Sequence, residues 1–127
     1  MIWMQNRILT NVKQALGDAC KNVVSRRSNL SAKFPTCLVN IISNNSVADD
    51  LDIEDEEVAV SCGVNVEIYS KVSVSESINL MSLANGAMYR MGFRRIEGPM
   101  HVEDPTSPEV FRVVSRYTRI IDRKSVV

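Results

Sequence analysis

The sequence predicts an α+β domain in which two helices pack on one face of a four-stranded, mainly antiparallel sheet. Two stretches repeat their apolar residues with the period of a helix, and four have the composition or alternation of strands. These elements follow the order α-β-β-α-β-β, and the short connections between successive strands favour antiparallel pairing. The chain of 127 residues has the length of one domain, so residues 1–127 are expected to fold as a single unit.

The first expected element is an amphipathic helix over residues 2–24. Its apolar face has the i, i+4, i+7, i+8 spacing and consists of Ile8, Val12, Ala15, Leu16, Ala19 and Val23. Gly17 interrupts this helix at a cost of about 1 kcal/mol relative to alanine. The polar stretch that follows, residues 25–33, is predicted to be a loop.

Two strands are predicted in the next part of the chain. Residues 36–43 (TCLVNIIS) are rich in β-branched side chains, and Pro35 before them cannot occupy a helix interior. Residues 58–70 (VAVSCGVNVEIYS) alternate between an apolar and a more polar face, which is typical of an antiparallel strand. The segment between the two strands, residues 44–57, is expected to be a loop.

A capping box, Ser73-x-x-Glu76, marks the expected start of the second helix. The apolar stripe that follows ends near Met91, and Gly92 is the expected left-handed residue that closes the helix.

Two further strands are predicted at residues 93–97 and 109–122, separated by a proline-rich loop at residues 98–108. The second face of the resulting sheet is chemically mixed. It carries Asn65, Glu67, Arg112 and Arg116 together with Leu38, Ile42, Val114 and Ile120. Such a face is expected to be covered in part by a partner. The alternative is a solvent-exposed face that carries a few exposed aliphatic side chains.

Little in the sequence indicates catalysis, a cofactor or a metal. Cys20, Cys37 and Cys62 are odd in number and form no CxxC pair, so buried thiols are expected rather than disulfides or a zinc site. The only histidine, His101, has no flanking catalytic signature. We therefore expect a protein that is not an enzyme and has no cofactor, with a minor enzyme relying on His101 as a remote alternative.

The sequence also argues against a membrane protein and a general nucleic-acid binder. No stretch approaches the roughly 18 apolar residues of a membrane span, and no signal peptide is expected at the start of the chain. The net charge is zero, whereas a protein that binds polyanions is usually basic. Only Phe93 and Tyr117 interleave with the arginines near the end of the chain, and no RNA-recognition signature is present.

Charge is nevertheless segregated, because residues 49–57 (DDLDIEDEE) contain seven acidic residues and no basic one. The acids of this segment, called the acidic segment below, are Asp49, Asp50, Asp52, Glu54, Asp55, Glu56 and Glu57. The alternation of Asp50, Asp52 and Glu54 is faintly like a calcium loop but lacks the required glycine and final glutamate, so no metal is expected. The segment is either a solvated loop or a contact with a basic surface of another subunit.

A series of short motifs follows in order between residues 34 and 121. They are Phe34-Pro35-Thr36, the acidic segment, Val66-Glu67-Ile68-Tyr69-Ser70-Lys71, Met91-Gly92-Phe93-Arg94-Arg95, Gly98-Pro99 and Arg112-Val113-Val114-Ser115-Arg116-Tyr117. In this order they resemble the tail-completion or tail-terminator (head-tail joining) proteins of long-tailed bacteriophages and prophages. The resemblance implies a small α+β subunit that forms a ring, commonly a hexamer, at the head-proximal end of the tail.

Such a ring caps the finished tail tube, stops its polymerisation and joins it to the head connector; it is not an enzyme. The implied partners are copies of the chain itself, the tail-tube protein and the head connector or head-closure protein. DNA would only pass through the ring lumen, and no membrane is involved. The protein would be part of the virion, assembled in the cytoplasm of the bacterial host.

A head-to-tail ring requires two different, complementary patches on each subunit. We therefore expect the acidic segment of one subunit to lie near basic residues of its neighbour, first of all Arg94, Arg95, Arg112 and Arg116. The proline-rich loop is a candidate arm toward the tail tube or connector. The alternatives are another neck protein such as a head-closure protein, a tail-tube subunit, or a small nucleic-acid-binding module that uses the arginine-bearing face.

Overall fold

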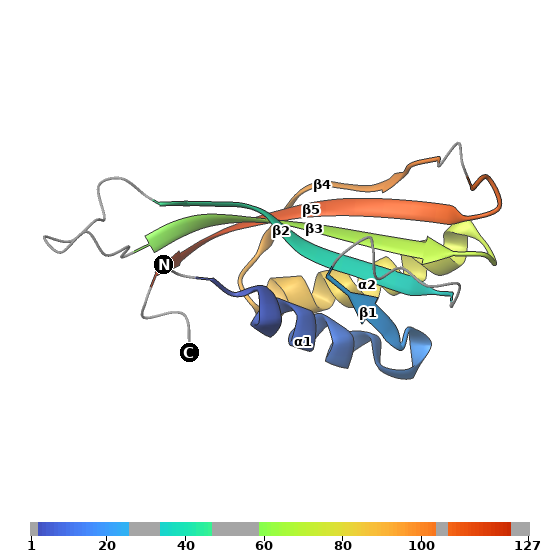
Figure 1. The fold of residues 1–127 in the computed structure, drawn as a ribbon, viewed down its shortest axis with the longest axis horizontal. Coiled ribbons are helices and arrows are strands. Elements are labelled where there is room, and N and C mark those ends of the chain that lie inside the picture. The colour runs from blue at the N-terminus through green and yellow to red at the C-terminus, as the bar shows by residue number, and fades with distance from the viewer. Residues whose placement is uncertain (1–2, 26–33, 47–58, 104–106, 123–127) are drawn as a thin grey trace, which may run out of the picture.

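The computed structural model describes residues 3–25, 34–46, 59–103 and 107–122. Within these ranges it contains two α-helices, a 3-10 turn and five strands (Figure 1). In chain order the helices and strands are α1 (Gln5–Leu16), β1 (Asn22–Val24), β2 (Thr36–Ser46), β3 (Ala59–Ser70), α2 (Val74–Arg90), β4 (Arg94–His101) and β5 (Phe111–Asp122).

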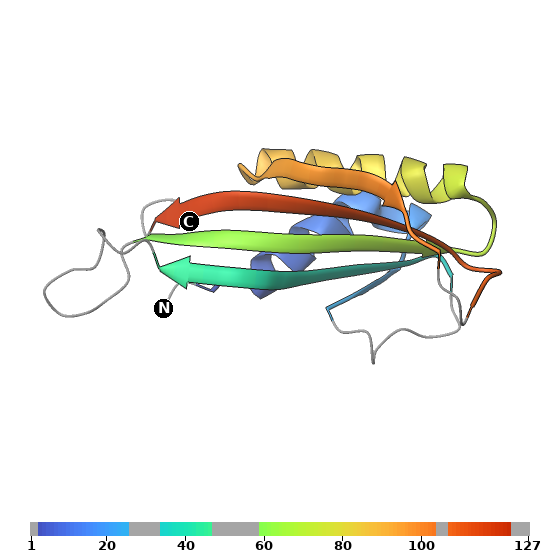
Figure 2. The ribbon, with the colours of Figure 1, turned by 90° about the horizontal axis from the view of Figure 1, so that it is seen from above.

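The strands form one mixed sheet in the order β1-β2-β3-β5-β4, with β4 at one edge and β1 at the other (Figure 2). β1 runs parallel to β2, and the other neighbours are antiparallel. The prediction of a four-stranded, mainly antiparallel sheet is therefore wrong. The two helices lie on the same face of the sheet (Figure 1), with α1 against β1 and β2 and with α2 against β3, β4 and β5.

The fifth strand arises because α1 is shorter than its apolar pattern suggested. Gly17 has a φ of 52°, in the left-handed region that favours glycine, and α1 ends at Leu16 rather than near residue 24. After a 3-10 turn at Gly17–Ala19, the chain is extended at Asn22, which pairs with Thr36. The strand β1 therefore begins inside the segment for which a helix was predicted.

The strand β4 is longer than predicted, because it continues past residue 97 to His101. The predicted loop at residues 98–108 is wrong over its first four residues. β4 can contain Pro99 because it pairs only with β5, and an edge strand tolerates the missing N–H of a proline. The register to β5 shifts twice, between Arg95 and Glu97 and between Glu97 and Met100.

The main core lies between the helices and the sheet. The alternation predicted for β3 is confirmed, since Val60, Cys62, Val64, Val66 and Ile68 all belong to this core. The three cysteines are buried free thiols, as predicted. Within the described ranges, no helix is long and apolar enough to cross a membrane.

The predicted start of α2 is confirmed by the capping contact, in which the Glu76 N–H donates to Ser73 Oγ at 3.0 Å. Tyr117 of β5 then fixes this helix to the sheet. Its hydroxyl donates to Asn85 Oδ1 at 2.9 Å, and its ring is fully buried. The hydroxyl of the buried Tyr117 is therefore hydrogen-bonded to a side chain of α2, as buried tyrosines usually require.

Candidate functional site

The face of the sheet opposite the helices, called the second face, is the candidate functional site. It contains a recess of about 450 Å³, to which β2, β3 and β5 contribute neighbouring side chains. The alternation of β3 places Asn65, Glu67 and Tyr69 on this face. The register places Val114 of β5 opposite Glu67, and Arg116 opposite Asn65.

Glu67 is the centre of a buried polar cluster on this face, with only 1% of its surface exposed. Its Oε1 accepts from Arg112 Nε at 2.6 Å and from the Tyr69 hydroxyl at 3.1 Å, and Arg112 Nη2 contacts the same oxygen. Its Oε2 accepts from Asn65 Nδ2 at 3.0 Å. Both carboxylate oxygens therefore have donors, which is what a buried charge requires.

The guanidinium of Arg112 is held as a permanent cation in this cluster. Partial burial lowers the pKa of Arg112, but the hydrogen bond and charge of Glu67 outweigh this effect and leave the pKa above its ordinary value. The guanidinium also lies 5.9 Å from the centre of the Tyr69 ring, within the range of a cation–π contact. Arg112 is thus a positioned part of the face rather than a freely mobile charge.

One end of the second face is closed by a small apolar cluster of Leu38, Tyr69 and Val110, against which Val24 and Phe34 pack. Leu38, a member of this cluster, is 2% exposed, and Val114 of β5 is 5% exposed. The sequence predicted a mixed face that a partner covers in part, but these two side chains are already buried within the chain. The other end remains open, because Ile42 and Ile120 are 53% and 67% exposed. These two exposed aliphatic side chains are available for contact with a partner.

Two amide oxygens in the middle of the face are buried without a hydrogen-bond donor in the described part of the chain: Asn40 Oδ1 and Asn65 Oδ1. The two residues are opposite each other on β2 and β3. The orientation of Asn65 is fixed, because only its NH₂ group can donate to the Glu67 carboxylate. Asn40 Oδ1 and Asn65 Oδ1 are thus two neighbouring acceptors to which no described residue donates.

The four arginines that were predicted to lie near a neighbour's acidic segment differ in their contacts. Arg112 binds Glu67, and Arg116 Nη1 forms an ion pair with Glu97 Oε2 of β4 at 3.2 Å. Arg94 and Arg95 are exposed, and neither forms an ion pair with another described residue.

Arg94 and Arg95 lie on opposite sides of the sheet. Arg94 is opposite Thr118, which shares the second face with Arg116. Arg95 is opposite the core residue Tyr117 and lines a small recess with Asn85 of α2. The second face therefore brings Arg94, Arg112 and Arg116 together, whereas Arg95 lies on the helix side.

The acids of the acidic segment, from Asp49 to Glu57, lie outside the described residues. His101 lies at the end of β4, not in a loop, and is exposed. Among the side chains that the structure describes, no group of three or more His, Cys, Asp or Glu could hold a metal ion.

Sequence reasoning missed that Glu67 is buried within the chain itself, because it placed this residue on a mixed face that only a partner would cover. The signal that could have shown it is the presence of Asn65, Glu67 and Tyr69 at alternate positions, with Arg112 three places after the predicted start of the last strand. No protein-family model matches the chain, and no curated protein sequence matches it either.

Proposed function

We propose that this chain is a structural subunit of a bacteriophage tail. Copies of it form a ring at the head-proximal end of the tail tube, where the ring terminates polymerisation and joins the tail to the head connector. The protein is a virion component with no enzymatic role. Its partners are its own copies, most simply six in a ring, the tail-tube protein and the head connector or head-closure protein.

The observation that carries this proposal is the composition of the second face. It combines a rigid charged cluster around Glu67, two buried amide oxygens without donors in the described residues, and the exposed side chains Ile42 and Ile120. A face of this kind is suited to a specific protein contact, in which apolar burial supplies affinity and the polar groups fix the orientation.

The second patch that a head-to-tail ring requires is the acidic segment. The arginines Arg94 and Arg116 are the candidate receptors on the second face, since Arg94 has no ion-pair partner among the described residues and the ion pair of Arg116 is half exposed. Arg112 supports this surface from within through Glu67. Arg95 would contact a neighbour only if the interface also reached the edge at β4 and the helix side.

The test is the assembly state of the purified chain, measured by light scattering and negative-stain imaging. Replacing the acids of residues 49–57 with Asn and Gln, or changing Arg94 and Arg116 to Glu, is expected to convert rings to folded monomers. Lys13→Glu, a charge reversal on the exposed side of α1, is the matched control and should leave rings intact. A wild-type chain that stays monomeric at high concentration would contradict the proposal.

Imaging with isolated tail tubes separates the terminator role from its nearest alternatives. A terminator binds one end of a tube and stops at a ring, whereas a tail-tube subunit polymerises into long tubes by itself. A head-closure protein would bind the connector and leave tail tubes without a cap. Rings that cap one tube end support the proposed role, and either of the other two results contradicts it.

A further inference from the structure

The side of β4 that faces away from β5, called the β4 edge below, is open in the described part of the chain. β4 is the last strand of the sheet and pairs with β5 alone among the described strands (Figure 2). None of its eight residues is buried. An edge strand of this kind presents backbone N–H and C=O groups with which a strand of another molecule can pair.

The ladder between β4 and β5 shows which backbone groups are available at this edge. The Val102 N–H donates to the carbonyl oxygen of Arg112 at 2.9 Å. In an antiparallel ladder, residues that bond to one neighbour alternate with residues that bond to the other, and the register of β5 with β3 has no shift. Thr118 therefore bonds to β4, as Arg112 does, whereas Tyr117 bonds to β3. Arg95 is opposite Tyr117, so its backbone N–H and C=O point away from β5, toward the β4 edge.

Apolar side chains lie beside these backbone groups. Ile96 has no opposite residue on β5, because the register shifts at this point, and its side chain is 59% exposed. Such a bulge redirects a side chain at the edge of a sheet. On the helix side of the strand, Pro99 lines a small recess together with Ile78 and Met81 of α2. A strand added at the β4 edge therefore gains apolar contacts as well as backbone partners.

Arginines lie on both sides of the β4 edge. Arg94 is opposite Thr118 and belongs to the second face, whereas Arg95 lies on the helix side, and both are exposed. The only acidic residue of β4, Glu97, already forms an ion pair with Arg116. The charge at this edge therefore selects among the strands that could pair with it, and it favours a strand with acidic side chains on both of its faces.

The acidic segment, which lies outside the described residues, has a sequence that matches this edge. Leu51 and Ile53 alternate with Asp50, Asp52 and Glu54, which is the period of a strand with aliphatic side chains on one face and acids on the other. Further acids, at positions 49, 55 and 57, share the face of the two aliphatic residues. With nine residues against the eight of β4, the segment also has the length to pair along the whole edge.

We propose that the acidic segment of a second copy binds the β4 edge as an added strand. Its backbone pairs with the outward N–H and C=O of Arg95, Leu51 and Ile53 pack toward the recess on the helix side, and the acids of the opposite face meet Arg94. This inference rests on the proposed function, because it specifies how neighbouring copies in the ring contact each other. It extends that contact from the second face to the edge of the sheet.

Peptide binding tests this mode of contact. The acceptor is the full chain with the acids of residues 49–57 replaced by Asn and Gln, so that its own segment does not compete. The probe is a fluorescent peptide of residues 49–57, followed by anisotropy. Arg95→Gln keeps the backbone N–H and is expected to weaken binding about threefold, as for an exposed ion pair. Arg95→Pro also removes the outward N–H, which β5 does not use, and should weaken binding about fivefold more.

Matched controls separate strand addition from a general attraction between charges. Lys13→Gln removes a positive charge from the exposed side of α1 and should leave the affinity unchanged. A peptide of the same composition in which leucine and isoleucine are adjacent places them on opposite faces, and it should bind about tenfold more weakly. Hydrogen exchange needs no variant, and the Arg95 amide should exchange at least about tenfold more slowly when the peptide is bound. Equal affinity of the two peptides, or unchanged exchange at Arg95, would overturn the proposal.

Assembly of the full chain distinguishes failure of this inference from failure of the proposed function. A chain with Arg95→Pro and Ile96→Asp lacks the acceptor edge and should stay monomeric, as should a chain with the neutralised acidic segment. An equimolar mixture of the two should form 1:1 dimers, because one intact contact remains. If the edge variant forms rings while the variant with Arg94 and Arg116 changed to Glu does not, this inference is wrong and the proposed function stands. A monomeric wild type contradicts the proposed function, and the peptide measurement then still decides whether the edge binds.

Discussion

Arg112 and Glu67 are joined across two strands although they are not opposite each other in the register. Arg112 is opposite Tyr69 and reaches back to the Glu67 carboxylate, to which its Nε donates at 2.6 Å. Side chains diagonal to each other on one sheet face are close enough for such a contact when one of them is long. The pair places a buried, fully hydrogen-bonded charge under the face that we assign to subunit contact.

Arg112→Ala is expected to lower the free energy of unfolding by about 3 kcal/mol, because it leaves the Glu67 carboxylate buried without its cation. The measurement is urea denaturation followed by circular dichroism. Arg116→Ala is the matched control and should cost less than about 1 kcal/mol, since its pair with Glu97 is half exposed and screened by water. Equal effects of the two variants would show that the buried pair does not stabilise the fold.

Gly92→Ala is expected to destabilise the protein by about 1–2 kcal/mol, because an L side chain is strained at a φ of 85°. The new Cβ would also press on the Arg119 guanidinium. Gly86→Ala is the control, and it is expected to change the free energy of unfolding in the opposite direction. Gly86 lies inside α2, and a Cβ added there would meet only the end of the Arg90 side chain. Because alanine has the better helix propensity, this variant should be more stable by up to about 1 kcal/mol. Thermal unfolding of both variants tests the difference.

Gln5 protects the free edge of β2 with its side-chain amide. Its Nε2 donates to the Val39 carbonyl oxygen, and its Oε1 accepts from the Ile41 N–H, both at 2.9 Å. β1 pairs with β2 only as far as Leu38. Directly after this point, the side-chain amide of Gln5 makes the two hydrogen bonds that a backbone peptide group of a neighbouring strand would make.

Gln5→Ala is therefore expected to lower the free energy of unfolding by about 1–3 kcal/mol and to speed hydrogen exchange at the Ile41 amide. Asn6→Ala, at an exposed position in the same helical turn, should change neither quantity appreciably. An Ile41 amide that exchanges equally slowly in Gln5→Ala would show that the edge is protected by other means.

The features that sequence patterns predicted correctly are local ones. The alternation of β3 follows from burial of one sheet face, and the Ser73 cap follows from the needs of the helix end beside it. The strand β1 was missed because it is three residues long, too short for any periodic signal, and exists only through its pairing with β2.

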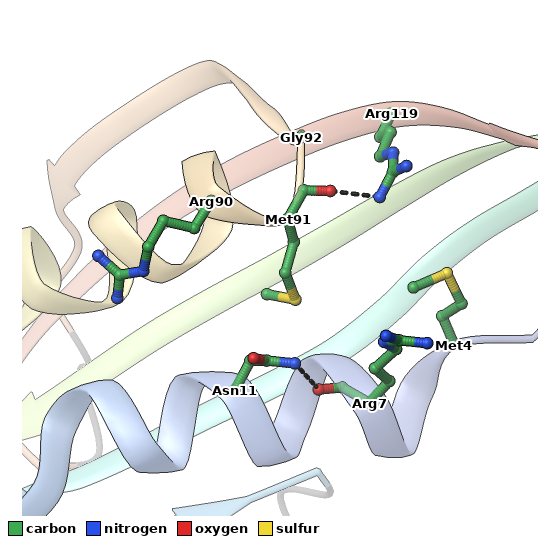
Figure 3. A pocket seen from close by; sticks show the side chains of 7 residues that line it. All are labelled: Met4, Arg7, Asn11, Arg90, Met91, Gly92 and Arg119. Atoms are coloured by element: carbon green, nitrogen blue, oxygen red, sulfur yellow. Dashed lines mark hydrogen bonds between the residues drawn. The ribbon is translucent and has the colours of Figure 1, made fainter. Parts of the chain in front are cut away.

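The candidate sites were predictable only in part, for the same physical reason. The sequence placed Glu67 and Arg112 on one face, but not their contact, because the pairing of β3 with β5 joins residues 45 positions apart. On the helix side, Arg7 of α1, Arg90 of α2 and Arg119 of β5 line one recess of the surface (Figure 3), because the fold alone brings these three elements together. Contacts between residues that are distant in the sequence depend on tertiary packing, which the pattern of a short segment does not reveal.

Alkaline pH is expected to destabilise the fold through Cys62 and Tyr117. Burial raises the pKa of Cys62 to about 11, although Arg119 partly opposes the shift, and burial raises the pKa of Tyr117 to about 12. The folded chain therefore holds these protons more tightly than the unfolded chain, in which the two groups ionise near their ordinary values, about 8.5 and 10. Their contribution to stability is complete below about pH 8.5 and is lost as the pH rises toward 11 and 12.

Urea denaturation at a series of pH values from 7 to 11 tests this expectation. The free energy of unfolding should fall above about pH 9, with a loss from Cys62 of roughly 3 kcal/mol at pH 11. Cys62→Ala removes the thiol without adding a polar group, so its stability should decline less steeply over the same range. A thiolate absorbance at 240 nm that develops near pH 9 in the folded wild type, and is absent from Cys62→Ala, would show that the thiol is accessible to hydroxide and would contradict the expectation.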